Sequence, residues 1–251
     1  AKARNENRLQ QLLDRVTIEL DKSGNTVRGI TSLKNLNMSG NNERLTINYY
    51  ISMPSKLTSH LSQRYGNINL PSKNEGECTL EVKYGNINGG SFTGNLTIES
   101  AYGNIELGDV KKTFIDAAYC GKVHVKNGDN VRIDSKYSNL DLKDVKELYV
   151  EAKYGNLKAG RLGKAVIELG YTNGDITYVE KALVVSKLSY GNLDVKELAA
   201  GFIKVYAEAR YGNMTLRIPS KASFKVTAQD MKYGNFEVNG FNAQTQKIEK
   251  S

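Results

Sequence analysis

Few residues of this sequence have the chemistry of a catalytic or metal-binding site. It contains two histidines, His60 and His124, and each is isolated from residues that could form a site with it. We interpret both as surface or strand residues and not as bases or metal ligands. The sequence has no glycine-rich phosphate loop, HExxH motif, paired-cysteine metal motif or nucleophile elbow. It therefore predicts a protein that is not an enzyme, with no catalytic residue, metal or cofactor.

The two cysteines, Cys78 and Cys120, are 42 residues apart and occupy different positions of an internal repeat. A disulfide requires Cα atoms about 4.4–6.8 Å apart, and this difference in position argues against one. Cys78 stands in an apolar position and is predicted to be a core residue. Cys120 stands where other repeats have a glycine.

Charged residues recur at fixed places relative to a repeated tyrosine. Acidic residues stand three positions before it: Glu81, Glu99, Asp116, Asp134, Glu151, Glu168, Glu208 and Asp230. Basic residues stand one position before it: Arg64, Lys83, Lys136, Lys153, Arg210 and Lys232. Calcium requires about six to eight oxygens that converge on one point, and a flat column does not supply them. We interpret the two columns as a solvated face of ion pairs, each worth about 0–1 kcal/mol.

The repeat itself predicts the elements that carry these side chains. Successive tyrosines are 19, 18, 17, 18, 17, 17, 19, 21 and 22 residues apart: Tyr65, Tyr84, Tyr102, Tyr119, Tyr137, Tyr154, Tyr171, Tyr190, Tyr211 and Tyr233. Seven of the ten begin a Tyr-Gly-Asn triplet, whose second and third residues are Gly66 and Asn67, Gly85 and Asn86, Gly103 and Asn104, Gly155 and Asn156, Gly191 and Asn192, Gly212 and Asn213, and Gly234 and Asn235. Self-similarity at this period indicates a solenoid.

Residues around each triplet alternate with the period of a half-buried strand. Six, four and two positions before the tyrosine stand apolar or small residues: Cys78, Leu80, Val82; Leu96, Ile98, Ser100; Val131, Ile133, Ser135; Leu148, Val150, Ala152; Ala165, Ile167, Leu169. After the triplet, the apolar positions move to three and five places on, as in Ile105 and Leu107, Leu140 and Leu142, Leu193 and Val195, Met214 and Leu216, and Phe236 and Val238. This change of parity predicts a bend at the triplet, with glycine supplying a positive φ.

A third apolar position recurs eight residues after the tyrosine: Phe92, Val110, Val145, Leu162, Val179 and Leu198. Each coil is therefore expected to have two strands and one shorter side. An apolar period of two excludes a helical repeat, and propeller blades of about 40–45 residues are more than twice as long. The predicted fold is an all-β, single-stranded parallel β-helix of about ten coils with 17–22 residues per coil.

The ends depart from the repeat, as terminal coils of a solenoid do. Helical apolar spacing predicts a short helix over residues 5–14, and strands are expected over 15–21 and 44–52. We predict an N-terminal cap over 1–55, solenoid coils over 56–240 and a tail over 241–251. The chain begins at Ala1 without a methionine, and we expect it to be a processed or truncated form whose export signal is missing.

Stacked coils copy a residue type into a ladder. The tyrosines are predicted to stack, and Tyr84, Tyr102, Tyr137, Tyr154, Tyr171, Tyr190 and Tyr211 are the ligand-binding candidates, for example for a glycan. The competing and favoured interpretation is a stabilising stack. The asparagines Asn67, Asn86, Asn104, Asn139, Asn156, Asn192, Asn213 and Asn235 are predicted to hydrogen-bond from coil to coil.

The Tyr-Gly-Asn corners, the cap segment from Leu12 to Ile18 and the segment from Ile47 to Pro54 resemble an adhesin-like family of domains of unknown function found in Bacteroidetes envelope proteins. The resemblance covers nearly the whole chain. It implies a right-handed β-helix that is secreted, periplasmic or attached to the membrane through an N-terminal lipid that this chain lacks.

The formal net charge is +8, with Lys and Arg spread along the chain, which favours attraction to anionic surfaces over nucleic-acid binding. We therefore expect a non-enzymatic module of the bacterial envelope, an adhesin whose partner is a cell-surface glycan or envelope protein. The alternatives are a periplasmic scaffold or envelope-stress interaction module and, less favoured, a polysaccharide-active enzyme. The sequence does not identify the ligand, the oligomeric state or the coil handedness.

Overall fold

The computed structural model describes residues 6–34 and 44–225. Its contacts divide the chain into two units, Ala1–Met53 and Pro54–Ser251. The predicted corner at Tyr233, the pair Phe236 and Val238, and the tail over 241–251 lie outside the described residues.

The N-terminal unit contains helix α1 (Glu6–Leu13) and an antiparallel hairpin of β1 (Val16–Ser23) and β2 (Thr26–Leu33). Gly24, in the two-residue turn, has a φ of 57°, which glycine adopts without steric cost. The helix and the first strand fall where they were predicted, whereas β2 was not predicted.

The prediction of a strand over residues 44–52 is wrong. Over this segment the structure has no strand, and Arg44 forms an isolated bridge; Leu45 and Ile47 are half-buried, while residues 48–53 are exposed. The hydroxyls of Tyr49 and of Thr31 in β2 are in contact.

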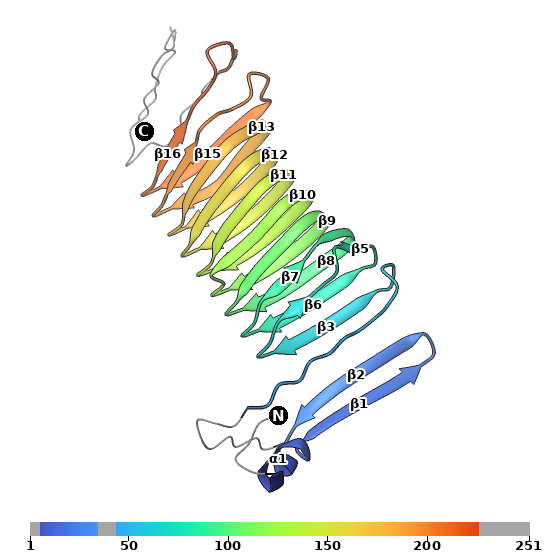
Figure 1. Cartoon of the computed structure of the whole chain (residues 1–251). Coiled ribbons are helices and arrows are strands. Elements are labelled where there is room, and N and C mark those ends of the chain that lie inside the picture. The colour runs from blue at the N-terminus through green and yellow to red at the C-terminus, as the bar shows by residue number, and fades with distance from the viewer. Residues whose placement is uncertain (1–5, 35–43, 226–251) are drawn as a thin grey trace. The chain divides into compact units, whose positions relative to one another are not determined.

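The second unit is a parallel β-solenoid, so the predicted fold class is confirmed (Figure 1). Its strands are β3 (Ser59–Arg64), β4 (Ile68–Asn69), β5 (Lys73–Asn74), β6 (Cys78–Lys83), β7 (Ile87–Gly89), β8 (Ser91–Ala101), β9 (Asn104–Ala118), β10 (Lys122–Lys136), β11 (Asn139–Lys153), β12 (Asn156–Gly170), β13 (Asn173–Ser189), β14 (Asn192–Val195), β15 (Lys204–Arg210) and β16 (Asn213–Leu216). The part of the chain that the structure describes includes nine of the ten repeated tyrosines.

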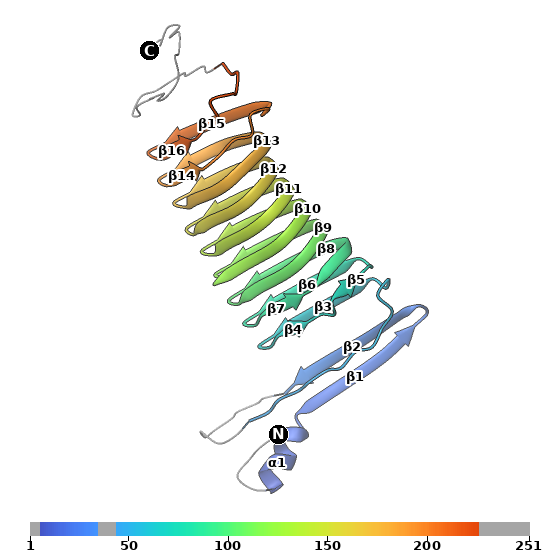
Figure 2. The same cartoon turned by 45° about the horizontal axis from the view of Figure 1, so that its top comes forward.

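Each coil pairs in register with its two neighbours. In β11, Leu140 and Val150 pair with Val123 and Ile133 of β10 on one side and with Leu157 and Ile167 of β12 on the other. From β9 to β12 a single strand of 15 residues follows almost the whole coil (Figure 2), where two strands and a shorter side were expected. The first coils keep the separate pieces β4, β5 and β7, which have two or three residues each.

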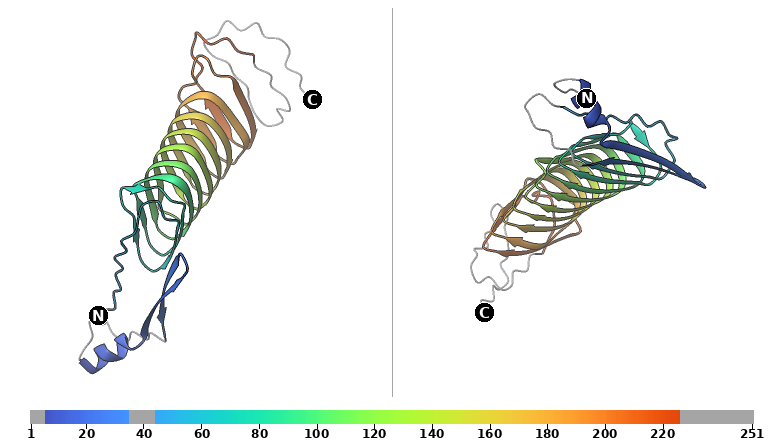
Figure 3. Two further views of the ribbon diagram at one scale, coloured as in Figure 1. Left: turned by 90° about the vertical axis from the view of Figure 1, so that its right-hand side faces the viewer. Right: turned by 90° about the horizontal axis from the view of Figure 1, so that it is seen from below.

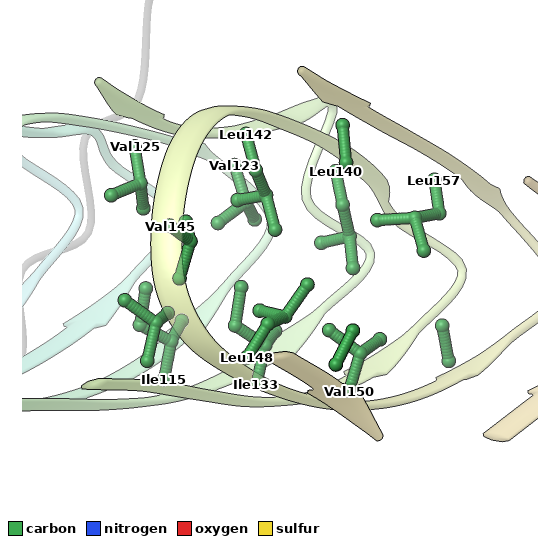
Figure 4. Packing of buried hydrophobic residues seen from close by; sticks show 14 of the residues in the cluster. Ile115, Val123, Val125, Ile133, Leu140, Leu142, Val145, Leu148, Val150 and Leu157 are labelled. Carbon is green, nitrogen blue, oxygen red and sulfur yellow. The ribbon is translucent and has the colours of Figure 1, made fainter. Parts of the chain in front are cut away.

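The core runs through the middle of the coils. The side chains of Leu140, Leu142, Val145, Leu148 and Val150 point inward from all sides of one coil (Figure 4), and none is more than 3% exposed. The hydrophobic residues predicted to face inward between Cys78 and Leu198 form one buried cluster, while Met214 and Leu216 pack against it partly buried. Figure 3 shows the coils of the second unit stacked one on another.

Candidate binding surfaces

The repeated tyrosines form one continuous ladder on the outside of the second unit. Neighbouring rings from Tyr65 to Tyr211 have centroids 4.7–5.2 Å apart and planes within 13° of each other. The predicted stack is confirmed, and all seven candidate ligand-binding tyrosines belong to it. The nine tyrosines of the ladder are 40–69% exposed. Because each internal ring has a neighbour on both faces, those faces cannot stack on a sugar, and the ladder presents ring edges and hydroxyls.

The prediction that glycine supplies the positive φ of the corner is wrong. The residue with positive φ is the tyrosine, with values of 51–61° at all nine described corners. This left-handed conformation is rare for a residue with a large side chain. The tyrosine can adopt this conformation here because two interactions stabilise it. Its N–H donates to the next coil, as from Tyr154 to the carbonyl of Gly170 at 3.0 Å, and its ring joins the stack.

Glycine follows the tyrosine because neighbouring corners approach closely. A Cβ on Gly85 would lie 1.7 Å from the carbonyl oxygen of Gly66, and one on Gly155 would lie 2.0 Å from that of Ser138. Real Cβ atoms do not come this close to an oxygen. The glycines of the triplet are therefore required for contact between coils and not for their own φ.

At three corners a buried Cys, Ser or Thr directly follows the tyrosine, and sequence reasoning missed what the hydroxyls of the Ser and Thr do. Ser138 Oγ accepts a hydrogen bond of 2.9 Å from the backbone N–H of Cys120 in the preceding coil. Thr172 Oγ1 accepts one of 3.3 Å from the N–H of Gly155 in the same way. The hydroxyl thus satisfies a buried N–H where the backbone cannot.

The corner at Tyr119 also has one residue more than its neighbours. Lys122 pairs with Asn104, so Cys120 and Gly121 together fill the space that one glycine fills elsewhere. Cys120 is therefore an additional residue rather than the direct replacement that was expected. Cys78 and Cys120 are both free and buried, and burial raises the pKa of each thiol, which makes both poor nucleophiles.

The asparagine ladder hydrogen-bonds from coil to coil, as predicted. The Nδ2 of Asn86 donates to the Oδ1 of Asn67 at 3.2 Å, and Asn104 donates to Asn86 at 3.1 Å. The same oxygens accept the backbone N–H of the next asparagine at 2.9 Å. The amides are therefore engaged in holding the corners together, and Asn235 lies outside the described residues.

The residues five, three and one positions before each tyrosine point outward on what we call the pre-corner face. Its predicted acidic and basic columns meet in the ion pair of Glu151 with Lys153 at 2.8 Å. Glu168 instead pairs at 3.6 Å with Lys187, a basic residue that stands in the acidic column of the next coil. The hydrogen bond to Lys153 lowers the pKa of Glu151. Asp230 and Lys232 lie outside the described residues.

An aromatic column on the same face was not anticipated. Five positions before the tyrosine, consecutive coils place Phe114, Arg132, Tyr149 and Val166 in register. The guanidinium of Arg132 lies over the Tyr149 ring at 4.4 Å and over the Phe114 ring at 5.9 Å. The signal in the sequence was an apolar residue at an outward position in several successive repeats.

The residues two, four and six positions after each tyrosine, or their paired equivalents, form the post-corner face. Here Asp141 has three basic neighbours: Lys143 at 3.3 Å, His124 at 3.1 Å and Lys122 at 3.6 Å. Burial alone would raise the pKa of Asp141, but hydrogen bonds from Lys143 and His124 hold it below its usual value. Lys122 also bonds Glu106 at 3.1 Å, which raises the pKa of this lysine.

The post-corner face also contains a hollow of about 390 Å³ over its first coils, among Asn69, Ser72, Asn88, Gly90, Glu106 and Leu107. It forms where the coil consists of the short strands β4 and β7 and where glycine replaces larger outward residues. Asn88 Nδ2 donates to Asn69 Oδ1 at 2.8 Å along one wall. The sequence signal was the pair Gly89-Gly90, which no other repeat has at this place.

Neither histidine is isolated, contrary to the prediction. His60 lies on β3 with Nε2 2.9 Å from Glu81 Oε1, and His124 lies on β10 beside Asp141. Within residues 6–34 and 44–225, no three His, Cys, Asp or Glu side chains gather in a way that could hold a metal ion. None of the helices described there is long and apolar enough to cross a membrane.

Comparison with known proteins agrees with this architecture. Neither the curated proteins nor the solved structures include a match to the chain. The Toastrack DUF4097 family model matches residues 11–251, which is nearly the whole sequence and includes both units. The chain therefore belongs to the Toastrack DUF4097 family.

Proposed function

We propose that this protein is a non-enzymatic module, secreted or held in the bacterial cell envelope, that presents a repetitive surface to a macromolecular partner, as an adhesin does. The observation that carries the proposal is the copying of outward side chains from coil to coil. Tyrosine, asparagine and charged columns repeat at the spacing of parallel strands, about 4.8 Å, along the second unit. A partner with its own repeat can make the same contact several times on such a surface.

The distribution of charge supports binding over catalysis. The carboxylates of the pre-corner face follow one another at regular intervals and have basic neighbours. Catalytic sites instead gather titratable groups in a cleft, where burial and neighbouring charges shift their pKa values strongly. The net charge of +8 supports a location beside anionic envelope surfaces.

The test is binding of the purified chain to arrays of glycans, extracellular-matrix proteins and cell-wall fragments. We expect saturable binding to at least one class of polymer, with affinity that rises with polymer length because a longer polymer spans more coils. The control is a chain of the same net charge without a solenoid. Absence of binding to all three classes would overturn the proposal.

A second candidate function is a scaffold that binds another envelope protein, and the aromatic column of the pre-corner face favours it. Arginine and tyrosine are enriched where proteins bind one another, and Arg132, Tyr149 and Val166 form such a surface. Substitution Val166→Asp should abolish capture of an envelope protein by this surface, whereas Val27→Asp in the hairpin should not. A captured protein that both variants retain would argue against this surface.

A further inference from the structure

The post-corner face combines two features that the repeat does not explain. Over the first coils it has the hollow described above, and over the next coils it has a run of basic side chains. The hollow is lined from the columns four and six positions after the tyrosine, and Lys126 and Lys143 stand in the second of these columns or its paired equivalent. From the coil of Gly90 to the coil of Lys143 this column covers three steps, or about 14 Å.

Register places the members of the column directly above one another. Gly108 donates its N–H to the carbonyl of Gly90 at 3.0 Å. Lys126 follows, because its neighbours Val125 and Asn127 pair with the neighbours of Gly108 and also with those of Lys143. Gly160 comes next, since its Cβ would meet the Lys143 carbonyl. Two stacked lysines therefore stand between glycines, with no side chains beside them in the column.

This lysine pair is electrostatically unfavourable by itself. Like charges directly opposite each other on parallel strands repel. Lys143 has Asp141 as a partner, but Lys126 has neither an ion pair nor a hydrogen bond to any described residue. Lys122 and His124 of the same coil are paired with Glu106 and Asp141, so Lys126 is the one of these three basic side chains that has no acidic partner among the described residues. An anionic group between the two ammonium groups would relieve the repulsion.

The hollow offers a different chemistry. The hydrogen bond between Asn88 and Asn69 leaves the Nδ2 of Asn69 as a donor and the Oδ1 of Asn88 as an acceptor, and the hydroxyl of Ser72 and one oxygen of Glu106 are also open to a ligand. Leu107 contributes an apolar part of the wall. Hydrogen-bond donors and acceptors alternate around the hollow, and glycines leave room between them. Such a surface can bind the hydroxyl groups of a sugar unit.

We propose that the post-corner face binds an acidic polysaccharide, with a sugar unit in the hollow and a carboxylate, sulfate or phosphate group between Lys126 and Lys143. This inference rests on the proposed binding function and names the class of its ligand. Neither part of the site specifies the ligand alone: the lysines recognise the anion and the amides recognise the hydroxyls. The glycines between the hollow and the lysines have no side chains that would block a ligand bound to both.

The test measures binding of four probes to the full chain by calorimetry: an oligogalacturonate, a short dextran sulfate, neutral dextran and poly-glutamate. We expect both acidic sugars to bind more tightly than neutral dextran, which lacks the charge, and than poly-glutamate, which lacks the hydroxyls. The relative affinities of oligogalacturonate and dextran sulfate distinguish a carboxylate from a sulfate ligand. Equal binding of poly-glutamate and the acidic sugars would overturn the proposal, because it would indicate attraction by charge alone.

Two variants separate the parts of the site. The double substitution Lys126→Gln and Lys143→Gln should weaken binding of the acidic sugars about tenfold or more, since each lost charge-assisted hydrogen bond is worth about a factor of ten. The matched control is Lys196→Gln with Arg217→Gln, which removes two charges from the same column in later coils and should leave affinity unchanged. Equal losses in the two double variants would contradict a local site.

Asn88→Leu should weaken binding of the acidic sugars and leave the weaker binding of poly-glutamate unchanged, because only sugars use the hollow. Circular dichroism verifies that the exposed substitutions keep the fold. An unchanged affinity for the sugars would exclude the hollow from the site. If the acidic sugars do not bind but the arrays identify another ligand, this inference fails and the proposed function stands. If neither assay detects a ligand, both fail.

Discussion

At the scale of single residues, the corner depends on two neighbours with opposite requirements. The tyrosine adopts a φ of 51–61°, a conformation that costs an ordinary residue about 1–2 kcal/mol. Stacking on each neighbouring ring contributes about 0.5–1.5 kcal/mol and offsets that cost. The following glycine has an ordinary φ but no room for a side chain. The strained residue is thus the one with the largest side chain.

This division predicts an unusual order of stabilities at Tyr154. Replacement by Ala or by Gly removes the ring from the ladder and should destabilise the protein in both cases. The Gly variant should nevertheless be about 1 kcal/mol more stable than the Ala variant, because only glycine adopts the positive φ without strain. Midpoints of urea unfolding would give the order, and a more stable Ala variant would contradict strain at this position.

Two glycines of the same coil should respond oppositely to a methyl group. Gly155→Ala should destabilise by about 1–3 kcal/mol, because its Cβ would lie 2.0 Å from the Ser138 carbonyl oxygen. Gly170→Ala is the control, since its Cβ would be 3.5 Å from the nearest atom, the Cγ of Lys153. This variant should be neutral or slightly stabilising in thermal melts. Similar losses in both would mean that close approach does not explain the corner glycine.

At the scale of elements, the coils and their core could be predicted because a period of two and a fixed corner spacing specify them. The positive φ of the tyrosine could not, since sequence rules assign this conformation to glycine or asparagine and only the stack makes it favourable. The strand β2 was missed because Thr26–Leu33 exposes most of both faces and lacks clear alternation. The post-corner hollow could not be predicted from the repeat, because the residues that line it do not recur from coil to coil.

Buried hydroxyls provide a test of how corner elements are held together. Ser138→Ala should destabilise by about 1–3 kcal/mol, because it leaves the buried N–H of Cys120 without its acceptor. Ser135→Ala is the matched control: its hydroxyl is buried without a hydrogen-bond partner among the described residues, so its removal should be neutral or stabilising. Chemical denaturation of the two variants would check this difference, and equal effects would show that the hydrogen bond contributes little.

The charge cluster on β10 and β11 should make stability depend on pH through Asp141. Its pKa is held below the ordinary value of 3.8, so the folded state binds its proton less readily than the unfolded state. The resulting stabilisation is complete above that value and is lost as the pH falls through the lowered pKa of the folded protein. Asp141→Asn should therefore lower the melting temperature at neutral pH but have a smaller effect in acid. A pH-independent difference would exclude this linkage.

At the scale of the whole molecule, the second unit is a one-dimensional array in which each coil contacts its neighbours. The stability of such an array is approximately the sum of coil and interface contributions. The core cluster is continuous from Cys78 to Leu198, and the same inward positions recur in each coil. One coil should then be replaceable by the next, provided that the register is kept.

A deletion tests this property directly. Removal of Tyr154–Gly170, the 17 residues of one coil, joins Lys153 to Tyr171 and places residue 172 above Ser138. The variant also carries Thr172→Gly, because a Cβ above Ser138 would meet its carbonyl oxygen, as it would at Gly155 in the intact chain. We expect a folded protein with a melting temperature only a few degrees lower, since one coil and one interface are lost while the ladders close again.

The matched control removes fewer residues and should be more damaging. Deletion of residues 154–161, about half of the same coil, leaves a segment too short to return to the next corner. Inward residues can no longer reach their positions, and the strands on either side lose their register. Circular dichroism melts and limited proteolysis should show cooperative unfolding for the 17-residue deletion and loss of structure for the shorter one. Equal tolerance of both deletions would mean that register between coils does not determine the fold.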